Sequence, residues 1–263
     1  MNTLYFVFSC LGLVGGLLCA TGDILFDLKG KGNQKLGTSK NIDSNWTKMA
    51  DWRFGWSIAL ALIGDALVCL GFYSLGMQIA ESRPVLGYLT LGFGYFGSFA
   101  GILIHSLCCL QALIYKGAMK RGSLEIADDI LEKIYKQVAV PFFAGYISLL
   151  APTITVIIAI FNGALNVPKI CVILNPLVFL IFGITCRKIN PVKFQDLPGI
   201  VMPSLGLGMF GLIGMLNLNL GQKKTQNLQN SGRLLTKARQ TARQATRPMK
   251  SENQLQRARL QAT

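Results

Sequence analysis

Long apolar stretches separated by short polar segments dominate the first 220 residues of the chain. The longest, residues 85–117, has almost no charged side chain, whereas about 20 apolar residues suffice for a helix to cross a bilayer. Similar stretches predict five further membrane-spanning helices. They lie at residues 4–28, 53–80, 138–161, 168–186 and 197–218. The pattern therefore predicts an all-α, polytopic transmembrane bundle of six helices.

Residues 123–137 have a different pattern, with apolar side chains on one helix face and charged side chains on the other. Their apolar positions follow the spacing i, i+3, i+4, i+7. These residues are Ala127, Ile130, Leu131 and Ile134. Ser123 is placed to cap the start of such a helix. We expect one short amphipathic surface helix, which lies on the membrane or leads into the next helix.

The charged residues are few and unevenly distributed. They make up 14% of the chain, against about 25% in a typical soluble domain. Residues 221–263 hold ten Lys or Arg and a single acid, Glu252. We expect residues 1–220 to form the transmembrane domain and residues 221–263 to form a basic, disordered tail. The tail suits contact with anionic lipid, and its lack of aromatic residues argues against sequence-specific binding of nucleic acid.

The sequence contains none of the common motifs of soluble enzymes. There is no P-loop, no G-x-S-x-G and no H-E-x-x-H. The single histidine, His105, excludes a zinc site built on several histidines, and the seven cysteines lie in or at the ends of apolar stretches, where they pack as small apolar residues. The sequence assigns no catalytic residue, metal site or cofactor.

Small and acidic residues follow one another along one face of the first predicted helix. Gly12, Gly16 and Ala20 recur every four residues, a spacing that lets two helix backbones approach closely. Asp23 and Asp27 continue nearly the same stripe, so we expect both carboxylates to face other helices and not lipid.

We expect the polar residues at membrane depth to meet in one intramembrane pocket. The candidates are Asp23, Asp27, Arg53, Ser57, Asp65, Ser98, His105 and Asn175. Asp65 lies near the predicted bilayer centre, where a charged carboxylate needs a partner. The favoured hypothesis is binding or transport of a lipid or small molecule. One alternative is a membrane-embedded, lipid-modifying enzyme that uses His105 with Asp23 or Asp65. Another is a structural or immunity-type protein in which these side chains only join helices.

The N-terminal stretch lacks a basic start and continues to residue 28, which predicts a retained first helix and not a signal peptide. We therefore expect an integral, multi-pass protein of the cell membrane. The loops at residues 29–52, 116–137 and 187–196 are rich in Lys and Arg, and so is the tail, although six helices would place loops and tail on opposite sides. Charge therefore leaves the orientation open.

A few short motifs resemble a known family. They are Gly22-Asp23-Ile24-Leu25, Trp52-Arg53, Gly64, Gly71 and a glycine-rich third helix that carries the lone histidine. Over about residues 10–220 the chain resembles a family of uncharacterised bacterial six-helix membrane proteins, a domain of unknown function. The resemblance implies a six-helix architecture and no particular activity, and it does not extend to the tail.

Overall fold

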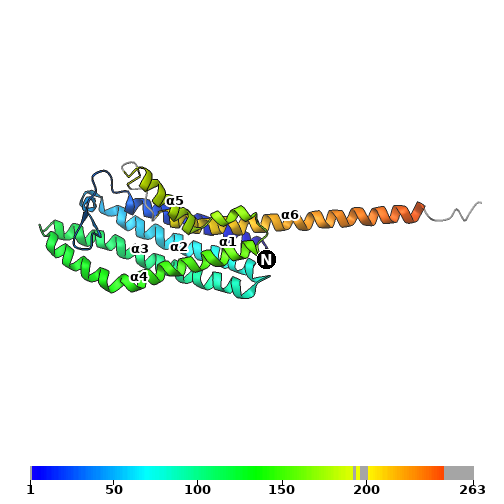
Figure 1. Ribbon diagram of the computed structural model, residues 1–263, viewed down its shortest axis with the longest axis horizontal. Helices are drawn as coiled ribbons and strands as arrows, with labels where there is room; N and C mark the ends of the chain where they lie inside the picture. Colours follow the sequence, from blue (N-terminus) through cyan, green and yellow to red (C-terminus); the bar gives the residue numbers. More distant parts are fainter. Residues whose placement is uncertain (1, 192–193, 196–200, 246–263) are drawn as a thin grey trace, which may run out of the picture. The chain divides into compact units, whose positions relative to one another are not determined.

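The computed structural model describes residues 2–191, 194–195 and 201–245, most of them in helices (Figure 1). In chain order the elements are α1 (Asn2–Asp27), β1 (Lys35–Leu36), β2 (Ile42–Asp43), η1 (Ser44–Lys48), α2 (Asp51–Ala80), α3 (Pro84–Met119), α4 (Leu124–Phe161), η2 (Lys169–Ile173), α5 (Pro176–Ile189) and α6 (Val201–Ala245). The chain forms two compact units, residues 1–218 and residues 219–263. The helix bundle belongs to the first unit.

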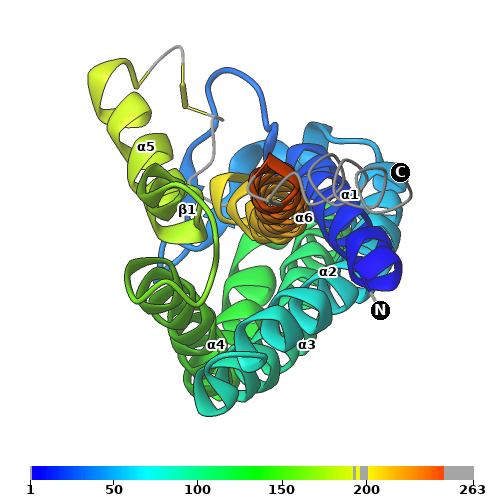
Figure 2. The same cartoon turned by 90° about the vertical axis from the view of Figure 1, so that its right-hand side faces the viewer.

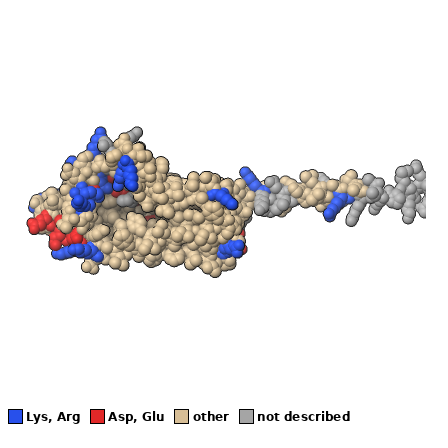
Figure 3. Space-filling view, viewed as in Figure 1, with Lys and Arg blue, Asp and Glu red and all other residues tan. Residues whose placement is uncertain are grey.

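Within the described residues, five helices are long and apolar enough to cross a membrane. They are α1, α2, α3, α4 and the part of α6 from Val201 to Lys223. In the first unit, charged side chains gather at the two ends of the bundle and leave a nearly uncharged band between them (Figure 3). The predominantly helical class is therefore confirmed, and five of the described helices have the length and composition of membrane-spanning helices. The predicted number of six spanning helices is not reproduced, because α5 has 14 residues and a length of only about 21 Å.

The predicted helix at residues 168–186 breaks at Asn175. A residue before proline is disfavoured in the helical conformation, and Asn175 is extended, with φ −151° and ψ 160°. Its side-chain oxygen instead accepts hydrogen bonds from the backbone N–H groups of Leu177 and Val178, at 2.9 and 3.1 Å, and so caps α5. The preceding residues form the 3₁₀ helix η2. Seen along the bundle, α5 stands apart from α1, α2 and α3 (Figure 2).

The predicted surface helix is the first part of α4 and not a separate element. Ser123 caps it as expected, accepting a hydrogen bond from the N–H of Ile126 at 3.2 Å. Its apolar residues Ala127 and Leu131 are buried against the loop between α1 and α2, where Trp46 belongs to the same cluster. Of the two expected arrangements, the structure shows the second, because this segment leads directly into the rest of α4 and its apolar face packs against the protein itself.

The tail also differs from its prediction as a disordered segment. Residues 221–245 are helical and continue α6, while residues 246–263 lie outside the described residues. No proline occurs between Pro203 and Pro248, and the segment is rich in the good helix formers Gln, Leu, Lys, Arg and Ala. Extending an existing helix also avoids the cost of nucleating a new one.

Glycines bring the backbone of α1 against two neighbours, as the sequence predicted for this face. A Cβ atom on Gly12 would lie 2.6 Å from the Cα of Gly71 in α2. A Cβ atom on Gly16 would overlap Gly208 of α6. These close approaches fix α1 between α2 and α6, which places Asp23 beside both helices.

Two apolar clusters stabilise the bundle, one toward each end. The first joins α2, α4 and α6 through Phe72, Leu75, Val156, Phe210 and Ile213, among others. The second joins α3 and α4 to the α1–α2 loop through residues that include Ile42, Trp46, Phe54, Tyr115 and Leu131. The polar side chains at membrane depth lie between these clusters.

Substitution of Gly12 by alanine should destabilise the bundle, because the added methyl group meets the backbone of α2. We expect a loss of about 1–3 kcal/mol, the usual cost of overpacking. Thermal unfolding of the detergent-solubilised protein measures the change. Gly92→Ala is the matched control, since nothing lies within 4 Å of its added Cβ. Equal melting temperatures for the two variants would contradict the proposed close contact.

Candidate functional site

A cavity of about 600 Å³ lies inside the first unit, and all six α-helices contribute to its lining. This volume falls within the range of about 300–1,000 Å³ that is typical of small-molecule sites. Its deep end is formed by residues of α1, α2, α3 and α6, including Cys19, Ala61, Gly97 and Leu207. Its other end is formed by the loop between α1 and α2.

The lining is polar at one end and apolar along one side. The loop end carries Lys29, Asn33, Lys35, Asp43 and Gln195. The apolar side comes from α4 and α5 and consists of Phe142, Tyr146, Leu149, Leu180 and Ile184. A cavity with this distribution suits a molecule that has both a polar and an apolar part.

Four of the eight predicted site residues line the cavity. They are Asp23, Asp27, Asp65 and His105. The described lining does not contain the other four, Arg53, Ser57, Ser98 and Asn175. Ser57 and Ser98 are buried within α2 and α3, and Asn175 caps α5. The sequence therefore identified the acidic and imidazole groups of the cavity, but it also included residues whose contacts are with other parts of the fold.

His105 of α3 lies in a network that joins four helices. Its Nδ1 atom is 3.2 Å from Oδ1 of Asp23 in α1, and its Nε2 atom is 2.7 Å from Oγ of Ser57 in α2. The hydroxyl of Ser204 in α6 donates to Oδ2 of Asp23 at 2.6 Å. Both ring nitrogens and both carboxylate oxygens of this network are therefore occupied by protein groups.

The hydroxyl of Ser57 fixes where the protons of the network lie. It donates to the backbone carbonyl of Gly22 at 2.6 Å, so Nε2–H of His105 donates to Ser57. The remaining proton lies between Nδ1 and Asp23, and the histidine–aspartate pair is neutral overall whichever atom holds it. The order serine, imidazole, carboxylate resembles that of hydrolases, but Ser57 has no exposed surface and does not contribute to the described lining.

Asp65 occupies a different environment from Asp23. It is the middle residue of α2, its exposed fraction is 6%, and its carboxylate faces Gly101 of α3. Among the described residues, no Lys, Arg or His nitrogen lies within the ion-pair distance of 4.0 Å. The thiol of Cys19 is a hydrogen-bond neighbour. Asp65 is thus a cavity carboxylate that the described chain does not neutralise.

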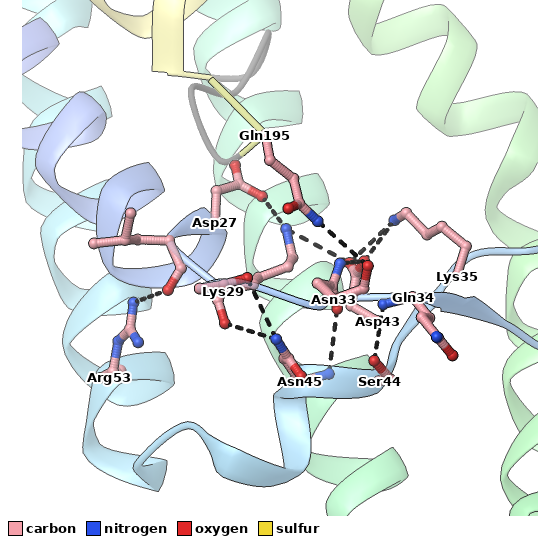
Figure 4. Close-up of polar contacts among 12 residues, drawn as sticks. Asp27, Lys29, Asn33, Gln34, Lys35, Asp43, Ser44, Asn45, Arg53 and Gln195 are labelled. Carbon is pink, nitrogen blue, oxygen red and sulfur yellow. Dashed lines mark hydrogen bonds and ion pairs between the residues drawn. The ribbon is translucent and has the colours of Figure 1, made fainter. Parts of the chain in front are cut away.

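A second network closes the loop end of the cavity (Figure 4). Lys29 lies 2.8 Å from Oδ1 of Asp27 and 3.5 Å from Oδ2 of Asp43. Lys35 also contacts Asp43, at 3.0 Å, and the amide of Asn33 donates to the same carboxylate at 2.6 Å. Two lysines therefore balance two aspartates, although Oδ2 of Asp27 has no hydrogen-bond partner within the described chain.

The charge of Lys29 depends on these aspartates. Burial opposes its ammonium form, but the attraction of Asp27 and Asp43 exceeds this effect and raises the pKa of Lys29 above its ordinary value of 10.5. Because the pKa of Lys29 is higher in the folded state, its charge stabilises the fold below its ordinary pKa of 10.5 as long as its acidic partners are ionised. This contribution of Lys29 is lost as the pH rises through the raised pKa.

Backbone contacts hold the loop in place. The amide of Asn45 donates to the carbonyls of Lys29, Gly30 and Lys31, and its exposed fraction is 3%. Asn45-Trp46-Thr47 matches the N-glycosylation pattern, and in this fold the amide nitrogen of Asn45 is buried in these three contacts. Arg53 donates to the carbonyl of Leu28 at 2.8 Å, just after the end of α1.

Sequence reasoning missed the contribution of the α1–α2 loop to the cavity. Lys29, Lys35 and Asp43 lie in a segment that appeared to be an ordinary polar loop. One signal was present, because Ile42, Trp46 and Met49 are large apolar residues within this polar stretch, and all three are buried. Ser204 had no recognisable signal, since its role depends on the contact between α1 and α6.

The described residues contain no group of three or more His, Cys, Asp or Glu side chains positioned to hold a metal ion. The chemistry of the cavity is therefore best described by its two neutral networks and by the acidic oxygens that they leave without partners.

Replacement of Lys29 by methionine should destabilise the protein strongly, because the buried Asp27 loses its one described cation and Asp43 keeps only the exposed Lys35. We expect a cost of about 3–5 kcal/mol in thermal or denaturant unfolding. Lys35→Met is the matched control, since Lys35 contacts the same Asp43, but its side chain is 54% exposed, against 12% for Lys29. Its removal should cost at most about 1 kcal/mol. Similar losses in both variants would refute the central role of Lys29.

Comparison with known proteins assigns the chain to a family, but it does not assign an activity. No curated protein and no solved structure matches the chain. The model of a family of unknown function (DUF6796) matches residues 1–221, which confirms the resemblance to a domain of unknown function. The matched region contains all the described residues that line the cavity. The chain therefore belongs to this family of unknown function, whose matched region carries several helices apolar enough to cross a membrane.

Proposed function

We propose that this membrane protein binds an amphiphilic small molecule or lipid in its intramembrane cavity. The observation that carries the proposal is the cavity of about 600 Å³, which has an apolar side from α4 and α5 and polar groups at the loop end. Such a site buries the apolar part of a ligand and orients it through a few polar contacts. Transport of the ligand in the cell membrane is the corresponding proposal for the cellular role.

We also infer six crossings of the membrane, of which the fifth is broken. Ser204, near the start of α6, contacts Asp23 near the end of α1, whereas Asn217 of α6 contacts Gln78 near the end of α2. Since α4 ends at Phe161 on the side of Gln78, the chain has to return to the opposite side before α6 begins. The elements η2 and α5 together make this return, and short helices broken within the membrane are typical of substrate sites in transporters.

An enzyme that uses His105 as acid or base has less support. A general acid or base has to reach the reacting group of its substrate, but both ring nitrogens of His105 already contact Asp23 and Ser57. Ser57 is fully buried, so it cannot serve as a nucleophile for a ligand in the cavity in this arrangement. The network instead supports a structural role that holds α1, α2, α3 and α6 around the cavity.

Filling the cavity should remove a ligand that co-purifies with the protein. Leu180→Trp adds an indole ring to the apolar side, and Phe182→Trp is the matched control, because Phe182 is 59% exposed and is not part of the described lining. Native mass spectrometry and lipid analysis of the solubilised proteins would measure the bound molecule.

We expect one defined species, in a fixed ratio to the protein, in the wild type and in Phe182→Trp, and its loss in Leu180→Trp. A uniform background of the same lipids in all three proteins would contradict the proposed cavity function.

A further inference from the structure

We propose that the ligand of this cavity carries a positively charged amine, which pairs with the carboxylate of Asp65. This inference rests on the proposed cavity function and specifies the chemistry of the ligand. It starts from the charges of the lining, among which Asp65 is the one acid that the two side-chain networks of the described residues do not include.

The acids of the lining differ in their partners. Asp23 is paired with His105, and Asp27 and Asp43 share two lysines. Asp65 has no ion-pair partner among the described residues. The remaining cation of the lining, Arg187, lies in the last turn of α5 and forms no ion pair with a described acid. A cationic ligand would supply the missing counter-charge of Asp65. An unpaired charge is most costly near the centre of the membrane, where Asp65 is expected to lie.

The surroundings of Asp65 leave room for such a group. A Cβ atom on Gly101 would lie 3.3 Å from Oδ2 of Asp65, so glycine keeps a side chain away from the carboxylate. The neighbouring lining residues Ala61 and Gly97 are also small. An ammonium group needs only this much space beside a carboxylate, because it donates hydrogen bonds from one compact centre.

A metal ion fits these surroundings less well than an amine. Hard cations such as Ca²⁺ and Mg²⁺ require six or more oxygen ligands. Around Asp65 the described lining offers the thiol of Cys19, small apolar residues, and Asp23 and His105, which already pair with each other, and the described chain holds no metal-binding group of acids, Cys and His. An amine is satisfied by one carboxylate and a few acceptors.

One buried carboxylate oxygen of the cavity lining lacks a hydrogen-bond partner among the described residues. Asp27 is 2% exposed, and its Oδ2 atom accepts no hydrogen bond from the described residues, although its Oδ1 atom contacts Lys29. Buried carboxylate oxygens are normally satisfied, so an unpaired one in a cavity wall indicates a donor from outside the chain. The hydrogens of an amine are donors of this kind.

The apolar side of the cavity determines the rest of the ligand. Phe142, Tyr146, Leu180 and Ile184 line the side formed by α4 and α5 and suit an alkyl or aromatic body. We therefore assign the ligand to the amphiphilic amines, which combine an ammonium group with an apolar body.

The test compares three probes of equal chain length: dodecan-1-amine, which is an ammonium ion at neutral pH, dodecan-1-ol and dodecanoic acid. Each is titrated into the full-length protein in nanodiscs, and thermal unfolding is followed with a thiol-reactive dye that reports the buried free cysteines. The proteins are the wild type, Asp65→Asn and Asp129→Asn, a control at an exposed acid of α4 that pairs with Lys133. The cavity-filled variant Leu180→Trp measures the general effect of each probe on the membrane.

In the wild type and in Asp129→Asn we expect the amine to bind about tenfold or more tightly than the alcohol, with the acid weakest. In Asp65→Asn the amine and the alcohol should bind within about threefold of each other, because the charge pair is gone. Asparagine has the shape of aspartate and removes an unpaired buried charge, so we expect this variant to fold. The comparison of the three probes in the wild type does not depend on the folding of any variant.

Equal binding of amine and alcohol in the wild type would overturn the inference while leaving the cavity function intact. A preference for the amine that persists in Asp65→Asn would also overturn it, because the charge would then be recognised elsewhere. Failure of all three probes to shift the wild type relative to Leu180→Trp would overturn both the inference and the proposed cavity function.

Discussion

Two glycines of α1 allow its backbone to touch the backbones of α2 and α6, and the site depends on these contacts. Gly12 meets Gly71, and Gly16 meets Gly208, before α1 continues to Asp23. At that level Asp23 is close enough to hydrogen bond with Ser204 of α6 and to pair with His105 of α3. Side chains larger than hydrogen at Gly12 or Gly16 would separate the helices and leave the carboxylate and the imidazole buried without each other.

The same helix packing also brings together the charged side chains that neutralise one another inside the protein. A charged side chain at membrane depth is costly, and the fold meets this cost with two networks of zero net charge, one around His105 and one around Lys29. Buried pairs of this kind add little to stability over apolar packing, but loss of one partner is severe. The exception at Asp65 is therefore informative, since it is the place where the described chain does not supply its own counter-charge.

Much of this architecture could be predicted from apolar periodicity, because membrane-spanning helices need only length and low charge. The acids Asp23, Asp27 and Asp65 could be identified too, since polar residues in apolar stretches are rare and face inward. Partners were harder to predict. Ser204 contacts Asp23 because α6 packs against α1, and Lys29 contacts Asp27 because of the path of the α1–α2 loop. No local sequence pattern predicts either contact. The break at Asn175 was visible as Asn-Pro, but a proline can also lie inside a continuous helix, as Pro152 does in α4.

The apolar cluster of α2, α4 and α6 also opposes the passage of ions beyond the cavity. Leu207 belongs both to the cavity lining and to this cluster, so the deep end of the cavity leads directly onto Phe72, Leu75, Phe210 and Ile213. These side chains are almost fully buried, so on this side the cavity borders closely packed apolar groups. An ion that reached Asp65 would meet this apolar layer beyond Leu207, and it would have to lose its hydration shell to enter it.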